Sequence, residues 1–169
     1  MEQDKGGLLK HCYAWILNDP QLRSWQNSKG ARLLWIKGDP GKGKTMLMIG
    51  LVDMLTNQLK GSSALSYFFC QNTVPHLNNG VSVLRGLIWK LLWNHPTLRK
   101  HMPDEYSCKS KDRGKEILKG SNTFSILKTM LPAMLRDSRF ETVYLLVDAL
   151  DECDSDSNRL IEWIAKDAS

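Results

Sequence analysis

Short runs of consecutive apolar residues recur along the chain, and the segments between them carry apolar residues at helical spacing. The runs lie in residues 32–37, 65–70 and 143–147. Unbroken apolar runs of this length are typical of strands that are buried on both faces, as in parallel sheets. Strands that alternate with helices indicate an α/β fold. The pattern therefore predicts an α/β domain with a mostly parallel sheet.

The segments between these runs predict helices, because their apolar residues repeat at three- and four-residue intervals. We expect helices over residues 44–59, 81–93, 124–135 and 160–165. Pro132 lies inside the third of them and would kink or shorten it, because proline removes a helical hydrogen bond. Residues 103–122 are polar and are expected to be the least ordered part of the chain.

The first 30 residues are expected to form an N-terminal helix and linker that lead into a core over residues 31–169. One helical face would carry the apolar residues Leu8, Leu9, Cys12, Trp15 and Ile16. Asn18-Asp19-Pro20 would end this helix. The polar residues from 24 to 30 then predict a linker.

Residues 38–45 carry the clearest chemical signal. They read Gly-Asp-Pro-Gly-Lys-Gly-Lys-Thr and fit the phosphate-loop pattern G-x-x-x-x-G-K-[ST] at every fixed position. A plain glycine-rich turn is the alternative, but a chance match in a chain of this size is on the order of one in a few hundred. The pattern also follows a predicted strand and precedes a predicted helix, as phosphate binding requires.

Each residue type in this loop has a chemical reason. Glycines let successive backbone N–H groups turn inward around a triphosphate. Lys44 would reach the β- and γ-phosphates, where it also serves catalysis, and the Thr45 hydroxyl would ligate Mg²⁺. We expect the nucleotide to be held by Gly38, Asp39, Pro40, Gly41, Lys42, Gly43, Lys44, Thr45 and Met46.

A second candidate feature is the acidic end of the predicted strand 143–147. Asp148 follows the strand directly, where a carboxylate is well placed to hold Mg²⁺, either as a direct ligand or from its second coordination shell. Asp151 or Glu152 would orient or activate the attacking water. The alternative is a solvated acidic loop or a cap of the last helix.

These two motifs together resemble the NACHT-type NTPases of the STAND class, in which a small residue and two further acids follow the magnesium aspartate, as in residues 148–152. Further segments are similar to the fungal vegetative-incompatibility group and to nephrocystin-like N-terminal NTPase regions; they are residues 5–9, 13–17, 34–45, 65–71 and 83–88. The resemblance implies a three-layer α/β/α P-loop fold. It also implies a signalling switch in which nucleotide exchange drives oligomerisation and slow hydrolysis resets the state. Residues 6–9 would border the base or ribose.

The same resemblance implies that the core is incomplete at its C-terminus. In this class a further strand follows the acidic motif and inserts between the phosphate-loop strand and the acidic strand. No candidate for it precedes Ser169. We therefore expect a fragment that is poorly stable or self-associating, and a truncated, non-hydrolysing nucleotide-binding or protein-interaction module is the alternative function.

Composition narrows the classes of protein and of partner that fit this sequence. The 169 residues are 42% apolar and 24% charged, which is typical of a globular domain. The net charge is +5, and the basic run 109–115 has no interleaved aromatic residue beyond Tyr106, so no nucleic-acid partner is expected. No apolar run approaches the length of a membrane span, so no membrane partner is expected either.

The cysteines, the histidines and two absent motifs bear on the redox state of the thiols, the choice of nucleotide and the class of enzyme. None of the four cysteines forms a C-x-x-C pair, and the histidines show no metal-ligand spacing, so we expect reduced thiols in a cytoplasmic protein. No Asn-Lys-x-Asp stretch for guanine recognition occurs, which favours ATP over GTP. A small-molecule kinase would gather arginines near the phosphates, whereas Arg85, Arg99, Arg113 and Arg136 are scattered.

Overall fold

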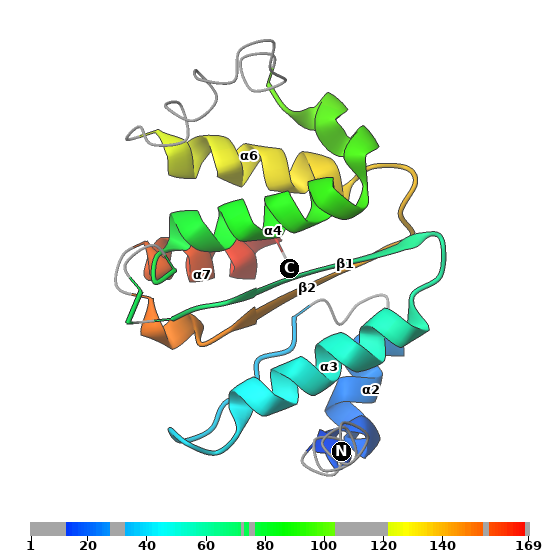
Figure 1. Cartoon of the computed structure of the whole chain (residues 1–169), viewed down its shortest axis with the longest axis vertical. Coiled ribbons are helices and arrows are strands. Elements are labelled where there is room, and N and C mark those ends of the chain that lie inside the picture. Colours follow the sequence, from blue (N-terminus) through cyan, green and yellow to red (C-terminus); the bar gives the residue numbers. More distant parts are fainter. Residues whose placement is uncertain are drawn as a thin grey trace, which may run out of the picture. The chain divides into compact units, whose positions relative to one another are not determined.

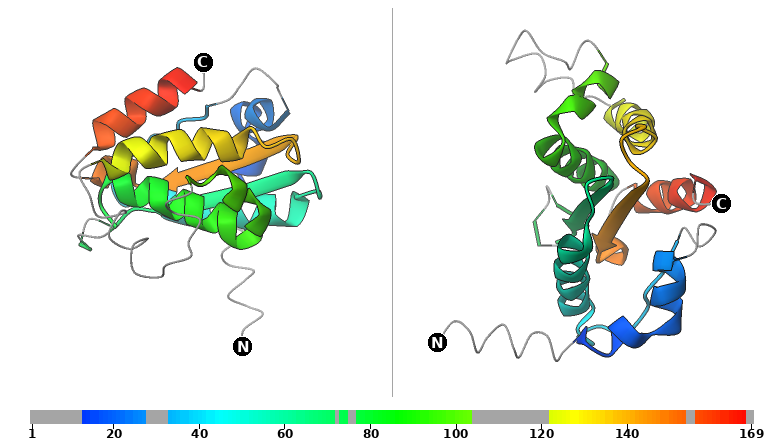
Figure 2. Two further views of the ribbon diagram at one scale, coloured as in Figure 1. Left: turned by 90° about the horizontal axis from the view of Figure 1, so that it is seen from above. Right: turned by 90° about the vertical axis from the view of Figure 1, so that its right-hand side faces the viewer.

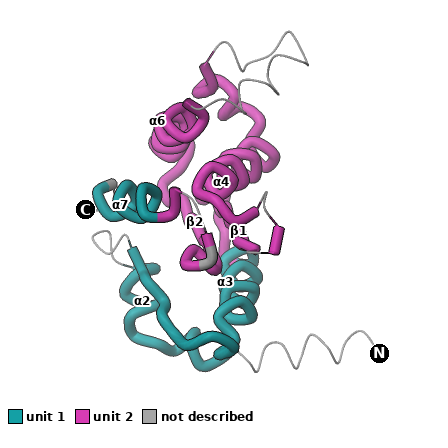
Figure 3. The backbone as a smooth tube through the Cα atoms, turned by 90° about the vertical axis from the view of Figure 1, so that its left-hand side faces the viewer, with its two compact units in different colours: residues 1–57, 158–169 teal, residues 58–157 magenta. Residues whose placement is uncertain are grey.

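The structure is a computed structural model that describes residues 13–27, 33–71, 73–74, 77–103, 122–153 and 156–167. The chain divides into two compact units, shown in two colours in Figure 3. Unit 1 comprises residues 1–57 and 158–169, and unit 2 comprises residues 58–157.

Unit 2 contains the sheet and the helices that cover it (Figure 1). Its elements are β1 (Ser63–Phe69), α4 (Gly80–Asn94), the 3₁₀ helix η2 (Pro96–His101), α6 (Thr123–Leu135), β2 (Thr142–Asp148) and the 3₁₀ helix η3 (Leu150–Glu152). The predicted helices and strands in this part of the chain are confirmed, with bounds shifted by a few residues. Only η2 and η3 were not expected.

β1 and β2 pair in parallel, from Ser63 opposite Thr142 to Phe69 opposite Asp148. Backbone hydrogen bonds continue the pairing beyond both ends of the strands. The Glu141 N–H donates to Ser62 O at 2.8 Å, and the Cys70 N–H donates to Asp148 O at 3.1 Å. The expectation of an α/β fold with a parallel sheet is confirmed for these two strands.

The strand expected over residues 32–37 is not present in the described residues. Residues 33–39 have no regular secondary structure, and no described strand pairs with them. Leu33 and Trp35 are 48% and 46% exposed. An apolar run becomes a strand only when a neighbour satisfies its backbone N–H and C=O groups. The described architecture is therefore α/β with a two-stranded sheet, and the expected three-layer P-loop architecture is not shown.

Helix α4 packs against β1 at close range. The Ser66 hydroxyl, which is fully buried, donates to Leu87 O at 2.8 Å. At Gly86 the helix comes so near to the strand that an added Cβ would lie 2.7 Å from Cε2 of Phe68. The helix begins at a cap, because the Asn79 side chain accepts a hydrogen bond from the Ser82 N–H at 2.9 Å. Its inner face supplies core residues Val83, Leu84, Leu87, Ile88 and Leu91.

Helix α6 lies beside α4 in both views of Figure 2. It runs past Pro132 to Leu135, so the expected shortening does not occur. The reason is the strength of its apolar face, which buries Phe124, Leu127, Met130, Leu131 and Met134. Burial of this face outweighs the hydrogen bond that proline cannot make.

Unit 1 contains the 3₁₀ helix η1 (Ile16–Asn18), α2 (Pro20–Asn27), α3 (Lys44–Gln58) and most of α7 (Ser157–Asp167). The polar linker expected from residue 24 is wrong as far as Asn27, because these residues belong to α2. Asp19 caps this helix: its Oδ1 accepts hydrogen bonds from the backbone N–H groups of Gln21 and Leu22, at 2.8 and 3.3 Å. Residues 6–12 of the expected N-terminal helix lie outside the described residues.

Helix α3 forms the core of unit 1 with Leu47, Leu51 and Leu55, which are all buried. Gly50 lies against the ring of Tyr13, with no room for a side chain between them. Within the part of the chain that the structure describes, no helix combines the length and the apolar character that crossing a bilayer would take.

Candidate functional site

The loop over residues 38–43 owes its conformation to two glycines. Gly41 and Gly43 have φ values of 75° and 79°. A Cβ added at either residue would meet nothing within 4 Å, so backbone conformation rather than crowding requires glycine there. Both residues are exposed, as are Gly38, Asp39, Pro40 and Lys42. Gly43, the second fixed glycine of the sequence pattern, is thus left-handed, as is Gly41 at a variable position of the pattern.

The side chain of Lys44 folds back over this loop. Its Nζ donates hydrogen bonds to Gly38 O at 2.6 Å and to Asp39 O at 3.1 Å. An ammonium group has three N–H donors, so two carbonyls leave one donor for another acceptor. The Lys44 ammonium group therefore places a positive charge beside the backbone of Gly38 and Asp39.

Helix α3 begins at Lys44, directly after the loop. The N–H of Leu47 donates to Gly43 O at 2.9 Å. The N–H groups of Lys44, Thr45 and Met46 precede that bond and belong to the first turn, whose N–H groups have no helical acceptor. Together with the helix dipole, these groups favour an anion at this end of a 15-residue helix. Thr45 presents its hydroxyl in the same turn and is exposed.

The end of β2 carries the second group of candidate residues. Asp148 is the last residue of the strand and only 5% exposed. Ala149 then takes a left-handed conformation, with φ 52° and ψ 39°, and η3 follows. Asp151 in η3 is exposed, and the side chain of Glu152 is outside what is described. This strand end therefore carries one buried carboxylate, that of Asp148, and one exposed carboxylate, that of Asp151.

The structure describes these two parts within separate units. Residues 38–45 lie in unit 1, and Asp148 and Asp151 lie in unit 2. Among the described residues, His, Cys, Asp and Glu side chains form no group of three that would hold a metal ion unaided. A magnesium ion would therefore take ligands from hydroxyl, water and phosphate oxygens as well, which is the usual coordination of Mg²⁺ beside a nucleotide.

Two groups with shifted pKa values lie away from these residues, where η2 meets the turn between α6 and β2. Hydrogen bonds from Lys100, Arg139 and His101 hold the pKa of Asp137 well below its usual range. The distances to the Asp137 carboxylate are 2.8 Å from Lys100 Nζ, 2.8 Å from Arg139 Nε and 2.6 Å from His101 Nε2. Burial, and then the Arg139 charge, lower the pKa of His95. These contacts hold η2 against the turn between α6 and β2, and we assign the cluster a structural role.

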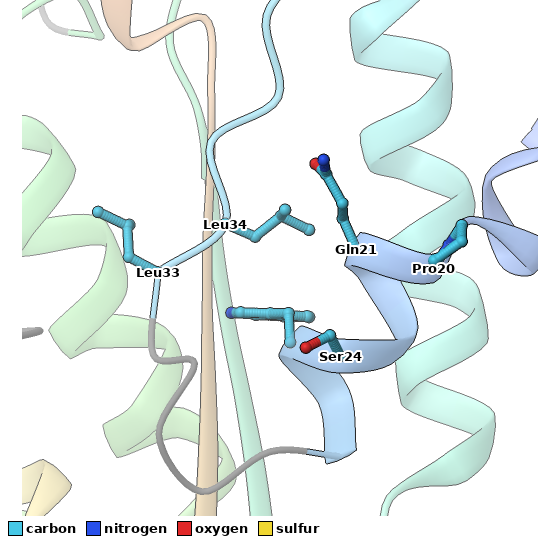
Figure 4. Close-up of a pocket in the computed structure, with 6 residues that line it drawn as sticks. Pro20, Gln21, Ser24, Leu33 and Leu34 are labelled. Atoms are coloured by element: carbon cyan, nitrogen blue, oxygen red, sulfur yellow. The ribbon is translucent and has the colours of Figure 1, made fainter.

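A pocket of about 350 Å³ lies in unit 1 between α2 and the segment that precedes the loop (Figure 4). Leu34 points toward α2 in this view. The residues that line the pocket are Pro20, Gln21, Ser24, Trp25, Leu33 and Leu34. None of them is charged and none belongs to residues 38–45, so the residues that line this pocket offer no cation to a phosphate group.

One side-chain contact in unit 2 could not be predicted from the spacing of residues in the sequence. The thiols of Cys70 and Cys153 lie 3.2 Å apart, although 83 residues separate them in the sequence. Both residues are buried. No local pattern marks such a pair, because the pairing of β1 with β2 brings the two cysteines together.

Comparisons with known proteins agree with the sequence resemblance. The family model described as "Nephrocystin 3, N-terminal" matches residues 11–169. The vegetative incompatibility protein HET-E-1 of Podospora anserina is 42% identical over 166 residues, which is 98% of this chain and 12% of the relative. No solved structure matches the chain. The predicted likeness to the NACHT-type group that includes fungal incompatibility and nephrocystin-like regions is thereby confirmed.

Proposed function

Because the chain belongs to the family of nephrocystin 3 N-terminal regions, we propose that it binds a magnesium–nucleoside triphosphate at residues 38–45. In this proposal it forms the switch core of a NACHT-type signalling NTPase. The observation that carries the proposal is the loop itself, where left-handed glycines, the Lys44 ammonium and the start of α3 combine. These are the donors that bind a chain of phosphates.

In the proposed complex, Lys44 exchanges a carbonyl partner for a phosphate oxygen. The N–H groups of the first α3 turn bind further phosphate oxygens, while Thr45 and Asp148 serve the magnesium ion. That ion would neutralise phosphate charge during transfer. Asp151 or Glu152 would orient the water, with ATP favoured over GTP as the nucleotide. Slow turnover, oligomerisation of the parent protein and a cytoplasmic location belong to the same proposal.

The central test compares a lysine of the loop with a lysine just before it. Lys44→Ala removes the ammonium that folds over the loop, whereas Lys37→Ala removes an equal charge from an exposed side chain. Calorimetry with Mg-ATP and Mg-GTP should show about a hundredfold weaker binding for Lys44→Ala, since charge-assisted contacts to phosphate contribute a few kcal/mol. Lys37→Ala should bind nearly as the original chain does. Equal affinity of all three proteins would refute nucleotide binding at this loop.

The magnesium and hydrolysis roles need separate variants. Asp148→Asn should weaken nucleotide binding when Mg²⁺ is present and leave binding in EDTA unchanged. Asp151→Asn and Glu152→Gln, made in the full-length parent, should keep binding and lower turnover. If neither of these two lowers turnover, another residue orients the water.

The alternative function is nucleotide binding without turnover. One observation favours it: no described strand pairs with residues 33–39, so the loop is supported by regular structure on its α3 side alone among the described residues. A phosphate-release assay on the same samples that bind nucleotide separates the two functions. Binding without phosphate release supports the alternative.

A further inference from the structure

Cys70 and Cys153 bring two thiols into contact in unit 2. The Cys153 thiol donates to Cys70 Sγ at a sulfur–sulfur distance of 3.2 Å. The two residues are 6% and 7% exposed. A disulfide has a sulfur–sulfur bond of about 2.05 Å, so the two atoms need to approach by about 1.2 Å.

The local structure explains why the thiols meet. Cys70 directly follows β1, and its N–H donates to Asp148 O at the end of β2. From Asp148 the left-handed Ala149 turns the chain into η3, and the Cys153 N–H closes that turn by donating to Leu150 O at 3.3 Å. Cys153 is thereby returned to the end of β1. The contact between the two thiols therefore depends on the backbone conformation at the ends of β1 and β2.

We propose that Cys70 and Cys153 form a reversible disulfide when the protein meets a hydroperoxide. One thiolate attacks the peroxide oxygen and becomes a sulfenic acid, while the O–O bond breaks and hydroxide leaves. The second thiolate attacks the sulfenic sulfur and displaces hydroxide, which leaves as water once protonated. In total, two thiols lose two protons and two electrons, and one hydrogen peroxide takes them up to become two waters. A dithiol reductant reverses the change by thiol–disulfide exchange.

The disulfide would act on the acidic turn. Residues 149–152 lie between β2 and Cys153, and both ends of this segment would then be fastened at one place, by the Cys70–Asp148 backbone bond and by the new covalent bond. The proposal stands apart from nucleotide binding, because it uses no residue of the phosphate loop. Disulfides in reducing compartments are typically transient sensors of this kind.

The experiment uses the whole chain with Cys12→Ser and Cys108→Ser, so that Cys70 and Cys153 are its remaining thiols. The folded protein is treated with hydrogen peroxide, quenched, unfolded and alkylated. Intact mass spectrometry should show loss of two hydrogen atoms, and peptide mapping should join the peptides that contain the two cysteines. Dithiothreitol should restore both thiols. The oxidised form should also unfold at a higher urea concentration, because a cross-link between distant residues restricts the unfolded chain.

Two single variants serve as matched controls. In Cys70→Ser and in Cys153→Ser the remaining thiol has no neighbour to resolve it, so its sulfenic acid should persist and be trapped by dimedone. Circular dichroism before oxidation checks that each protein is folded. The proposal is overturned if both thiols of the folded background protein stay alkylatable after peroxide. It is equally overturned if the disulfides found join two chains rather than two residues of one chain.

Discussion

Replacing Gly86 by alanine tests the close contact between α4 and β1. The new Cβ would lie 2.7 Å from Cε2 and 3.4 Å from Cγ of Phe68, and closer still to Cδ2. Carbon atoms in contact prefer separations of about 3.5–4.0 Å. The phenylalanine ring or the helix therefore has to move by roughly an ångström, in a region where the neighbouring residues Leu84, Leu87 and Ile88 are buried.

Two opposing effects set the magnitude. Overpacking of this kind costs about 1–3 kcal/mol. Alanine in a helix interior is favoured over glycine by about 1 kcal/mol. The difference leaves a net destabilisation of about 0–2 kcal/mol, with about 1 kcal/mol as the central value. The sign of the change thus separates a close contact from an open helix surface.

Urea unfolding followed by circular dichroism measures this change. Gly86→Ala should lower the free energy of unfolding, and Phe68→Leu should lower it as well, because it removes part of a half-buried ring. The double variant should lose less than the sum of the two, because the smaller side chain makes room for the new methyl group. If Gly86→Ala instead stabilises the protein by about 1 kcal/mol, as at an open helix position, the contact does not exist.

Three further predictions concern the cap of α2, the Asp137 cluster and the turn after β2. Asp19→Ala should cost about 1 kcal/mol in the free energy of unfolding, while Asp19→Ser should keep most of the cap; equal losses would exclude a capping role. Asp137→Asn should destabilise the protein above about pH 5. The loss in free energy of unfolding should shrink as the pH falls below the unfolded pKa near 3.9, because the lowered pKa of Asp137 stabilises the ionised folded state. A loss that does not depend on pH in urea titrations would contradict this. Ala149→Pro should unfold the turn, since proline cannot adopt the observed φ of 52°, and alkylation of Cys153 in the folded protein should then become rapid; unchanged protection would count against the turn.

Local physical chemistry was enough to predict much of this protein. Apolar periodicity predicted α3, α4, α6 and both strands of the sheet, because each of these elements buries one continuous apolar face or run. The spacing of residues 38–45 predicted the loop before α3, since left-handed conformations at Gly41 and Gly43 depend on those residues alone. The capping signal of α2 was also present in Asp19-Pro20, but the polar composition that follows it favoured a linker.

Other features depended on residues far apart in the chain. The run 33–37 is as apolar as a strand, yet a strand forms only where a neighbour supplies hydrogen bonds, and no described segment does so. Asp137 acquires its low pKa from Lys100, Arg139 and His101, and two of these, Lys100 and His101, belong to η2. Cys70 and Cys153 meet because the parallel register places Phe69 opposite Asp148 and the left-handed turn at Ala149 brings the chain back. Sequence periodicity reports the face that one segment buries, whereas these contacts depend on which segments bury their faces against each other.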